Sequence, residues 1–258
     1  MVFSTEELER YARHIMLKEI GGPGQQRLKA AHVALVGAGG LGAPAALYLA
    51  AAGVGKLTLI DPDRASLSNL QRQILYRSED VGELKSERAA AALKALNPHV
   101  EIVARADKLD GVSAEALLGG ADLILDGCDS YVARFSTNAV AHEFGVPLIS
   151  GAVGRWDGQL ATFKSGLTKG LPPDQRLPCY RCFVPQIPPE EEPCSAVGIV
   201  GALTGVIGAM MALEAIKEIT GAGESLAGKI MVFDGLTLQS RLVRLPPDPE
   251  CKVCGERG

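Results

Sequence analysis

The segment "HVALVGAGGLG" constrains the fold more than any other part of the chain. It places Gly37, Gly39 and Gly42 in a G-x-G-x-x-G pattern between an apolar run and a helical one, and Asp61 ends the next apolar run. This order is typical of a nucleotide-binding βαβ unit, in which the turn suits phosphate and the acidic residue accepts hydrogen bonds from ribose hydroxyls. The alternative is a tight strand-to-helix turn without a ligand.

Apolar runs and helical patterns alternate through the first half of the chain. We predict strands at residues 32–36, 57–61, 100–106, 122–126 and 147–151, and helices at 41–52, 84–96, 113–118 and 131–144. Such alternation implies βαβ crossovers. The predicted fold class is therefore α/β, a Rossmann-like, mostly parallel sheet with helices on both faces.

Both ends of the chain depart from this alternation. At the N-terminus, Ser4 and Glu7 form a capping-box pattern for an amphipathic helix, and Gly21-Gly22 is the predicted stop. After residue 152, "GQLATFKSG" predicts a strand, and "KIMVFDGLTLQSRLVRL" predicts an antiparallel pair around Asp234-Gly235. We expect a single domain, residues 1–258, with a helical arm at 1–30, a nucleotide-binding half at 31–152, and a second half at 153–258 that contains a long loop at about 165–195.

Composition excludes several classes of function. The 258 residues are 47% hydrophobic and carry a net charge of -4, so nucleic acid is not expected as a partner. No secretory signal is visible, which predicts a cytoplasmic protein without a membrane partner. Residues 195–213 carry no charge, but their glycines favour a buried core or subunit-interface helix over a membrane span. Gly201, Gly205 and Gly208 would permit close helix contact.

Cations follow the glycine-rich turn. Arg72 lies just past Asp61, and Lys85 stands near the start of a predicted helix. Phosphoryl or nucleotidyl transfer needs cations of this kind, because negative charge accumulates on phosphate oxygens. Two alternatives stay open: both side chains are solvated surface charges, or an arginine (Arg64 or Arg72) reads the 2′-phosphate of a dinucleotide.

The cysteines predict a metal site. Two C-x-x-C pairs, "CYRC" and "CKVC", supply four thiolates, enough for a structural tetrahedral Zn²⁺ site. Such a site would anchor the C-terminal tail to the long loop, and a redox dithiol is the alternative. The ligands would be Cys179, Cys182, Cys251 and Cys254. Cys128 is expected to be a small buried residue at a strand end.

Together these motifs resemble the MoeB/ThiF/HesA family of adenylyltransferases, bacterial relatives of ubiquitin-activating enzymes. The matching pieces include "RYARHIML", "SLSNLQRQ", "DLILDGCDS", "CYRC", "PCSAVGIVGALTGVIGAMMALEAIK" and "CKVCG". The pattern is most similar to molybdopterin-synthase adenylyltransferases. The resemblance implies ATP-dependent activation of the C-terminal Gly-Gly carboxylate of a small ubiquitin-fold sulfur carrier as an acyl-adenylate, with release of pyrophosphate, in molybdopterin or thiamine biosynthesis.

The resemblance also implies roles for individual residues. Arg72 and Lys85 would contact ATP phosphates, Asp129 would hold Mg²⁺, and Arg13 would reach into the neighbouring subunit of a homodimer. Ser130 stands where relatives often carry asparagine. The positions expected to bind nucleotide are Gly37, Gly39, Gly40, Gly42, Asp61, Ser68, Asn69, Leu70, Gln71, Arg72, Lys85, Asp129 and Ser130.

Partners and alternatives follow from the same resemblance. Cys194 aligns with a cysteine that links covalently to the carrier in some relatives, and a passive thiol is the alternative. With the sequence ending at Gly258, we expect no fused sulfurtransferase domain of the kind that some relatives carry, and we expect a separate sulfurtransferase or cysteine desulfurase. The alternative functions are an ATP-dependent tRNA-modifying dehydratase, an NAD(P)- or flavin-dependent oxidoreductase, and a non-catalytic nucleotide-binding scaffold.

Overall fold

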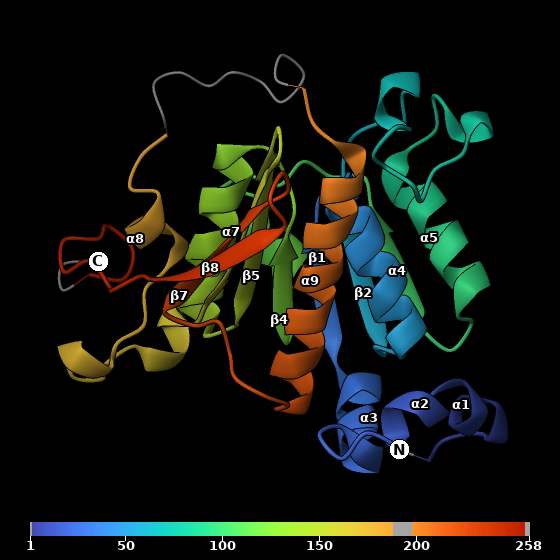
Figure 1. Ribbon diagram of the computed structural model, residues 1–258, viewed down its shortest axis with the longest axis horizontal. Coiled ribbons are helices and arrows are strands. Elements are labelled where there is room, and N and C mark those ends of the chain that lie inside the picture. Colours follow the sequence, from blue (N-terminus) through green and yellow to red (C-terminus); the bar gives the residue numbers. More distant parts are fainter. Residues whose placement is uncertain (1, 188–197, 256–258) are drawn as a thin grey trace.

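One eight-stranded sheet runs through the computed structural model, which describes residues 2–187 and 198–255 (Figure 1). The strand order is β3-β2-β1-β4-β5-β6-β7-β8; the first five strands are parallel and the last three antiparallel. All five strands predicted in the first half are present within a few residues of the expected bounds. The strands are β1 (His32–Val36), β2 (Lys56–Ile60), β3 (Glu101–Arg105), β4 (Leu123–Asp126), β5 (Leu148–Gly154), β6 (Asp157–Phe163), β7 (Lys229–Asp234) and β8 (Gln239–Arg244).

Helices cover both faces of the parallel part of the sheet. The α-helices are α1 (Thr5–Arg10), α2 (Ala12–Ile15), α3 (Gly21–Ala30), α4 (Gly42–Ala52), α5 (Lys85–Leu96), α6 (Ala114–Leu118), α7 (Tyr131–Phe144), α8 (Tyr180–Phe183) and α9 (Gly201–Thr220). Short 3₁₀ turns are η1 (Leu67–Asn69), η2 (Ser78–Asp80), η3 (Ser165–Thr168) and η4 (Pro173–Gln175). The four helices predicted in the first half begin and end within one residue of the expected bounds.

Alternation along each strand decides which face a side chain packs on. In β1, Val33 and Leu35 pack into one core with α4, α5 and α9, whereas Ala34 and Val36 pack into a second core with α6 and α7. Both faces are therefore apolar, as is typical of a buried parallel sheet. The predicted fold class is confirmed.

The N-terminal helix is shorter than the sequence predicted. Ser4 and Glu7 form the expected capping box, but the helix breaks at Tyr11, and Gly21-Gly22 begins α3 instead of ending a helix. The break has a tertiary cause: the Tyr11 ring is buried, and its hydroxyl accepts a hydrogen bond from Asn97 Nδ2 at 2.8 Å. The sequence reading missed α3, whose Leu28 lies fully buried in the core.

The long apolar helix α9 starts later than predicted, at Gly201, and continues to Thr220. Gly208 permits the expected close contact, since a Cβ there would lie 2.4 Å from Pro44 Cγ of α4. A Cβ on Gly201 would lie 2.2 Å from the Gln71 carbonyl oxygen, whereas no described heavy atom surrounds such a Cβ at Gly205. Among the described residues, no helix is both long and apolar enough to span a membrane.

The second half of the chain extends the sheet. β5 pairs with β6, and β7 and β8 form the predicted hairpin around Asp234-Gly235. Asp234 Oδ1 accepts the Leu236 N–H at 2.8 Å, which stabilises the turn. Of the predicted long loop, residues 165–187 contain η3, η4 and α8, and the remainder, with Cys194, lies outside the described residues.

Candidate active site

The glycine-rich turn joins β1 to α4 with the geometry that the motif predicts. Gly37 has φ +89°, a left-handed conformation that side chains disfavour. A Cβ on Gly42 would lie 1.8 Å from the Gly37 carbonyl oxygen, so only glycine allows the helix to start so close to the strand. The turn thus places the start of α4 directly beside the carboxyl end of β1.

A cleft of about 1070 Å³ opens at this end of the sheet. It lies at the carboxyl ends of β1, β2, β4 and β5, where the order of strand addition reverses between β1 and β4. In open α/β sheets, ligands bind at this switch point. Of the residues predicted to bind nucleotide, those lining the cleft are Gly37, Gly39, Gly40, Asp61, Arg72, Lys85, Asp129 and Ser130.

Asp61 is held by backbone N–H groups from two segments, the glycine-rich turn and the residues that follow β2. Its side chain accepts the Ala38 N–H at 2.7 Å and the Asp63 N–H at 2.9 Å, and the residue is 5% exposed. Burial raises the pKa of Asp61, although the nearby Lys85 charge opposes that shift. The carboxylate is therefore fixed at the end of β2 and retains lone pairs that face the cleft.

Lys85, the first residue of α5, is a buried cation. Its side chain is 6% exposed, and its ammonium nitrogen lies 2.9 Å from Asp63 Oδ2. The backbone supports the same arrangement, because Lys85 N donates to the Asp63 carbonyl at 2.9 Å. The alternative of a solvated surface charge is wrong for Lys85. For Arg72, the side chain is partly buried and donates to the Ser68 carbonyl at 3.0 Å, while also lining the cleft.

The rest of the "SNLQRQ" segment lies at the border of the cleft. Ser68, Asn69, Leu70 and Gln71 are not among the described residues that line it, so their nucleotide contacts stay predictions. Gln73, which the sequence reading passed over, does line the cleft. It is 5% exposed, its Nε2 lies against Gly39, and its Oε1 has no hydrogen-bond partner within the described residues.

Asp129 and Ser130 enter the cleft from the loop after β4. The helix cap of α7 is Ser130, whose hydroxyl accepts the Ala133 N–H at 3.4 Å, so Asp129 does not provide this cap. The serine hydroxyl thus satisfies a helix amide. Asp129 is left exposed, and its carboxylate makes no hydrogen bond with residues 2–187 or 198–255.

Arg13 does not join this cleft within one chain. It is exposed on α2, which packs beside α3 at the opposite end of the sheet from the glycine-rich turn (Figure 1). Any contribution from Arg13 to a nucleotide site therefore needs a second copy of the chain.

Two buried charges at the wall of the cleft were not predicted from the sequence, and one of them, Arg134, lines the cleft. Arg134 of α7 lies 3.3 Å from Asp126 Oδ2 at the end of β4, and both side chains are nearly inaccessible. The coulombic attraction of Asp126 raises the pKa of Arg134 against the effect of burial, so the arginine stays charged. The available signal was a charged residue in the first turn of a helix that follows an Asp-ended strand.

Cys128 lies in the same loop. It lines the cleft, and its thiol donates to Asp126 Oδ1 at 3.0 Å. Burial, together with the Asp126 charge, raises the pKa of Cys128 well above its ordinary value. The thiol therefore stays protonated. Cys128 follows a strand end as expected, but it is only partly buried, contrary to the expectation of a buried residue.

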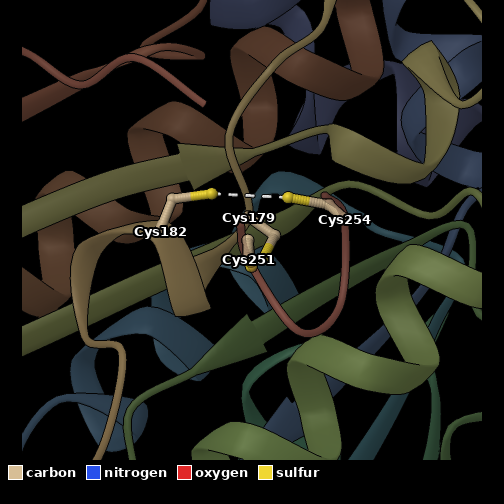
Figure 2. A group of neighbouring side chains, drawn as sticks. All are labelled: Cys179, Cys182, Cys251 and Cys254. Carbon is tan, nitrogen blue, oxygen red and sulfur yellow. Dashed lines mark hydrogen bonds between the residues drawn. The ribbon is translucent and has the colours of Figure 1, made fainter. Parts of the chain in front are cut away.

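The four cysteines of the two C-x-x-C pairs meet in space (Figure 2). Their sulfur atoms all lie within 4.8 Å of one another, with Cys179–Cys251 at 3.6 Å and Cys182–Cys254 at 3.3 Å. These separations are too long for disulfides, and these two pairs lie near the ~3.8 Å that a tetrahedral ion with Zn–S bonds of about 2.3 Å requires. The group can hold a metal and joins α8 to the C-terminal tail.

A glycine-rich turn, a ribose-type acidic residue and a buried lysine in one cleft define a Rossmann-like nucleotide-binding protein. Residues 11–253 match the model described as the ThiF family, and the chain belongs to that family. The family resemblance predicted from the motifs is confirmed.

Similar proteins carry related names. The sulfur carrier protein adenylyltransferase of Thermus thermophilus is 42% identical over 99% of this chain and 94% of that protein. The molybdopterin-synthase adenylyltransferase of Escherichia coli is 42% identical over 98% of each chain. The crystal structure of E. coli MccB shares the fold, with a TM-score of 0.80, 23% identity, and coverage of 99% of this chain and 74% of that one.

Proposed function

We propose that this protein is an ATP-dependent adenylyltransferase that activates the C-terminal Gly-Gly carboxylate of a small ubiquitin-fold sulfur carrier. Two of its relatives are named for sulfur carrier and molybdopterin-synthase adenylylation, and a third, 40% identical, is named a SAMP-activating enzyme E1. The pathways we propose are molybdopterin or thiamine biosynthesis.

The observation that carries this proposal is the buried Lys85 ammonium group beside the glycine-rich turn. A cation that is already desolvated and oriented costs little reorganisation when negative charge develops nearby. In a redox enzyme such a cation would only help to bind the phosphates of the cofactor, whereas in a transferase acting at phosphorus it also offsets the charge that develops during the reaction. The lysine therefore favours nucleotide as a substrate.

In the proposed reaction, one carboxylate oxygen of the carrier attacks the α-phosphorus of ATP. A new bond forms between that oxygen and phosphorus, and the bond to the bridging oxygen of the β-phosphate breaks. Pyrophosphate leaves with the electron pair. Lys85 and Arg72 would offset the charge on the phosphate oxygens, the turn at Gly37–Gly40 would cradle the phosphates, and Asp61 would hold the ribose.

The proposed metals have separate places. Asp129 offers the hard oxygen ligand that Mg²⁺ prefers, to be shared with phosphate oxygens, and bound Mg²⁺ would neutralise triphosphate charge. The four cysteines would hold Zn²⁺. Because protein would fill all four zinc positions, that ion would be structural and would anchor the tail, residues 251–254, to α8.

The wider organisation is also proposed. A homodimer would bring Arg13 of one chain to the cleft of the other, and a separate sulfurtransferase or cysteine desulfurase would supply sulfur. The half at 31–152 would bind nucleotide and the half at 153–258 would bind the carrier. Cys194 is proposed to contact the carrier tail, either as a covalent link or as a passive thiol.

An exchange assay tests the proposed function. Purified protein should exchange radiolabelled pyrophosphate into ATP only with a ubiquitin-fold carrier ending in Gly-Gly, and a panel of carriers would identify the pathway. The matched control is the same carrier without its last glycine. Absence of exchange with every carrier, together with a nicotinamide or flavin that copurifies, would favour the oxidoreductase alternative.

A further inference from the structure

The ion pair between Asp126 and Arg134 lies at one wall of the cleft, which Arg134 lines and below which Asp126 is buried. Arg134 is 7% exposed and Asp126 is 1% exposed. Desolvating two charges costs several kcal/mol for each ion, and apolar side chains of similar volume often fill such a space with equal or better stability. The pair therefore calls for an explanation other than stability.

Arg134 ties two segments of the cleft wall together. Its Nη1 donates to Ser150 Oγ at 3.0 Å, and its Nη2 donates to the Gly151 carbonyl at 2.9 Å and the Cys128 carbonyl at 2.5 Å. These acceptors belong to β5 and to the loop after β4. Only a guanidinium presents this many donors in one rigid plane.

Asp126 fixes the same loop from the other side. Its Oδ1 accepts the Cys128 N–H at 3.2 Å, and its Oδ2 accepts the Ser150 hydroxyl at 2.9 Å. The loop is also held at both ends, because Gly127 N donates to the Val36 carbonyl and Ser130 accepts the Arg134 N–H, each at 3.0 Å. The residues on either side of Asp129 are thus fixed, while the Asp129 carboxylate faces the cleft.

We propose that Arg134 is a positioning residue that, through the Cys128 carbonyl, holds Asp129 in the orientation in which it meets the Mg²⁺–nucleotide. This inference rests on the proposed function, since it assumes that Asp129 faces Mg²⁺–ATP. A loop that is already fixed loses little conformational entropy when the nucleotide binds. Removing the contacts of Arg134 would free the loop and therefore weaken nucleotide binding.

The experiment is a double-mutant cycle on nucleotide affinity, read by titration calorimetry of the full chain with Mg²⁺–ATP and without any carrier. Arg134→Lys keeps a cation opposite Asp126 but cannot bridge both carbonyls. We expect it to weaken Mg²⁺–ATP binding about tenfold, as loss of outer-shell support does at metal sites. In an Asp129→Ala background the same substitution should change affinity less than twofold.

Controls separate positioning from folding. Thr162→Val removes a buried hydrogen bond, from Thr162 Oγ1 to Glu214 Oε1 at 3.0 Å, at a position of β6 that does not line the cleft. It should lower the melting temperature without changing affinity. Should Arg134→Lys fail to fold, Ser150→Ala, which removes a hydroxyl bonded to both charges, should show the same dependence on Asp129.

Two outcomes would overturn the inference in distinguishable ways. An equal loss of affinity in the wild-type and Asp129→Ala backgrounds would show that Arg134 acts independently of Asp129, and it would leave the proposed function standing. A wild-type protein that does not bind Mg²⁺–ATP would refute the proposed function and this inference together.

Discussion

The ammonium nitrogen of Lys85 lies 2.9 Å from Oδ2 of Asp63, and the two partners differ sharply in exposure. The lysine side chain is 6% exposed and the aspartate side chain 66%. The cation is therefore the buried, oriented member of the pair, and the carboxylate is the member that solvent reaches. Phosphate oxygens could replace Asp63 beside Lys85 with little rearrangement of the protein.

Removing this cation should affect catalysis more than stability. We expect Lys85→Met to lower the rate of carrier-dependent ATP–pyrophosphate exchange on the order of a hundredfold, the scale for a lost electrostatic donor in an active site. Lys94→Met is the matched control, because Lys94 is exposed near the end of the same helix. A Lys85→Met rate within twofold of wild type would contradict the role assigned to this lysine.

Two glycines in helices should respond oppositely to alanine. Gly42→Ala would place a Cβ 1.8 Å from the Gly37 carbonyl oxygen, so we expect destabilisation of several kcal/mol or failure to fold. Gly205→Ala meets no described atom within 4 Å and should raise the free energy of unfolding by up to about 1 kcal/mol through helix propensity. Denaturant titration measures both, and a harmless Gly42→Ala would refute the packing described for the turn.

The cysteine group should bind one zinc ion per chain. Cys251→Ala and Cys182→Ala should each lose the metal and lower the melting temperature, because the ion joins the tail to α8. Elemental analysis and thermal unfolding check this, with Cys128→Ala as the cysteine control that keeps its zinc. Stoichiometric zinc in the Cys251→Ala protein would contradict the assignment of the four ligands.

We expect Asp80 to make the free energy of unfolding decrease at acid pH. The hydrogen bond from the Arg77 N–H, together with the Arg88 guanidinium, lowers the pKa of Asp80 below the ordinary 3.8. The folded state favours the ionised form of Asp80. The contribution of Asp80 to the free energy of unfolding is therefore complete above the unfolded-state pKa of 3.8, and it is lost as the pH falls through the lower folded-state pKa.

We therefore expect Asp80→Asn to lower the free energy of unfolding by about 1 kcal/mol at pH 6 and by less at pH 3. Denaturant titrations at the two pH values measure this difference. Glu79→Gln is the control, because Glu79 is largely exposed and makes only a 3.7 Å ion pair. An equal loss at both pH values would show that ionisation of Asp80 is not the cause.

Local patterns in the sequence determined most of the helices and strands and part of the cleft. The spacing of Gly37, Gly39 and Gly42 specifies a turn that only glycine can form, and the Asp-ended strand follows at once, so these features could be predicted from neighbours in the chain. The two C-x-x-C pairs likewise predicted a four-thiolate group, because the ability of a side chain to bind a metal depends on its residue type.

Tertiary structure decided what depends on contacts between distant segments. The helix break at Tyr11 follows from its bond to Asn97, and the burial of Lys85 follows from the meeting of β2 and α5. The position of Arg134 after an Asp-ended strand was a weak signal in the sequence, but its burial could not be predicted, because its partners lie on β4 and β5, which become neighbours only in the folded sheet. The burial of a charged residue in a helix depends on the segments that pack around it, so the sequence of the helix alone does not predict it.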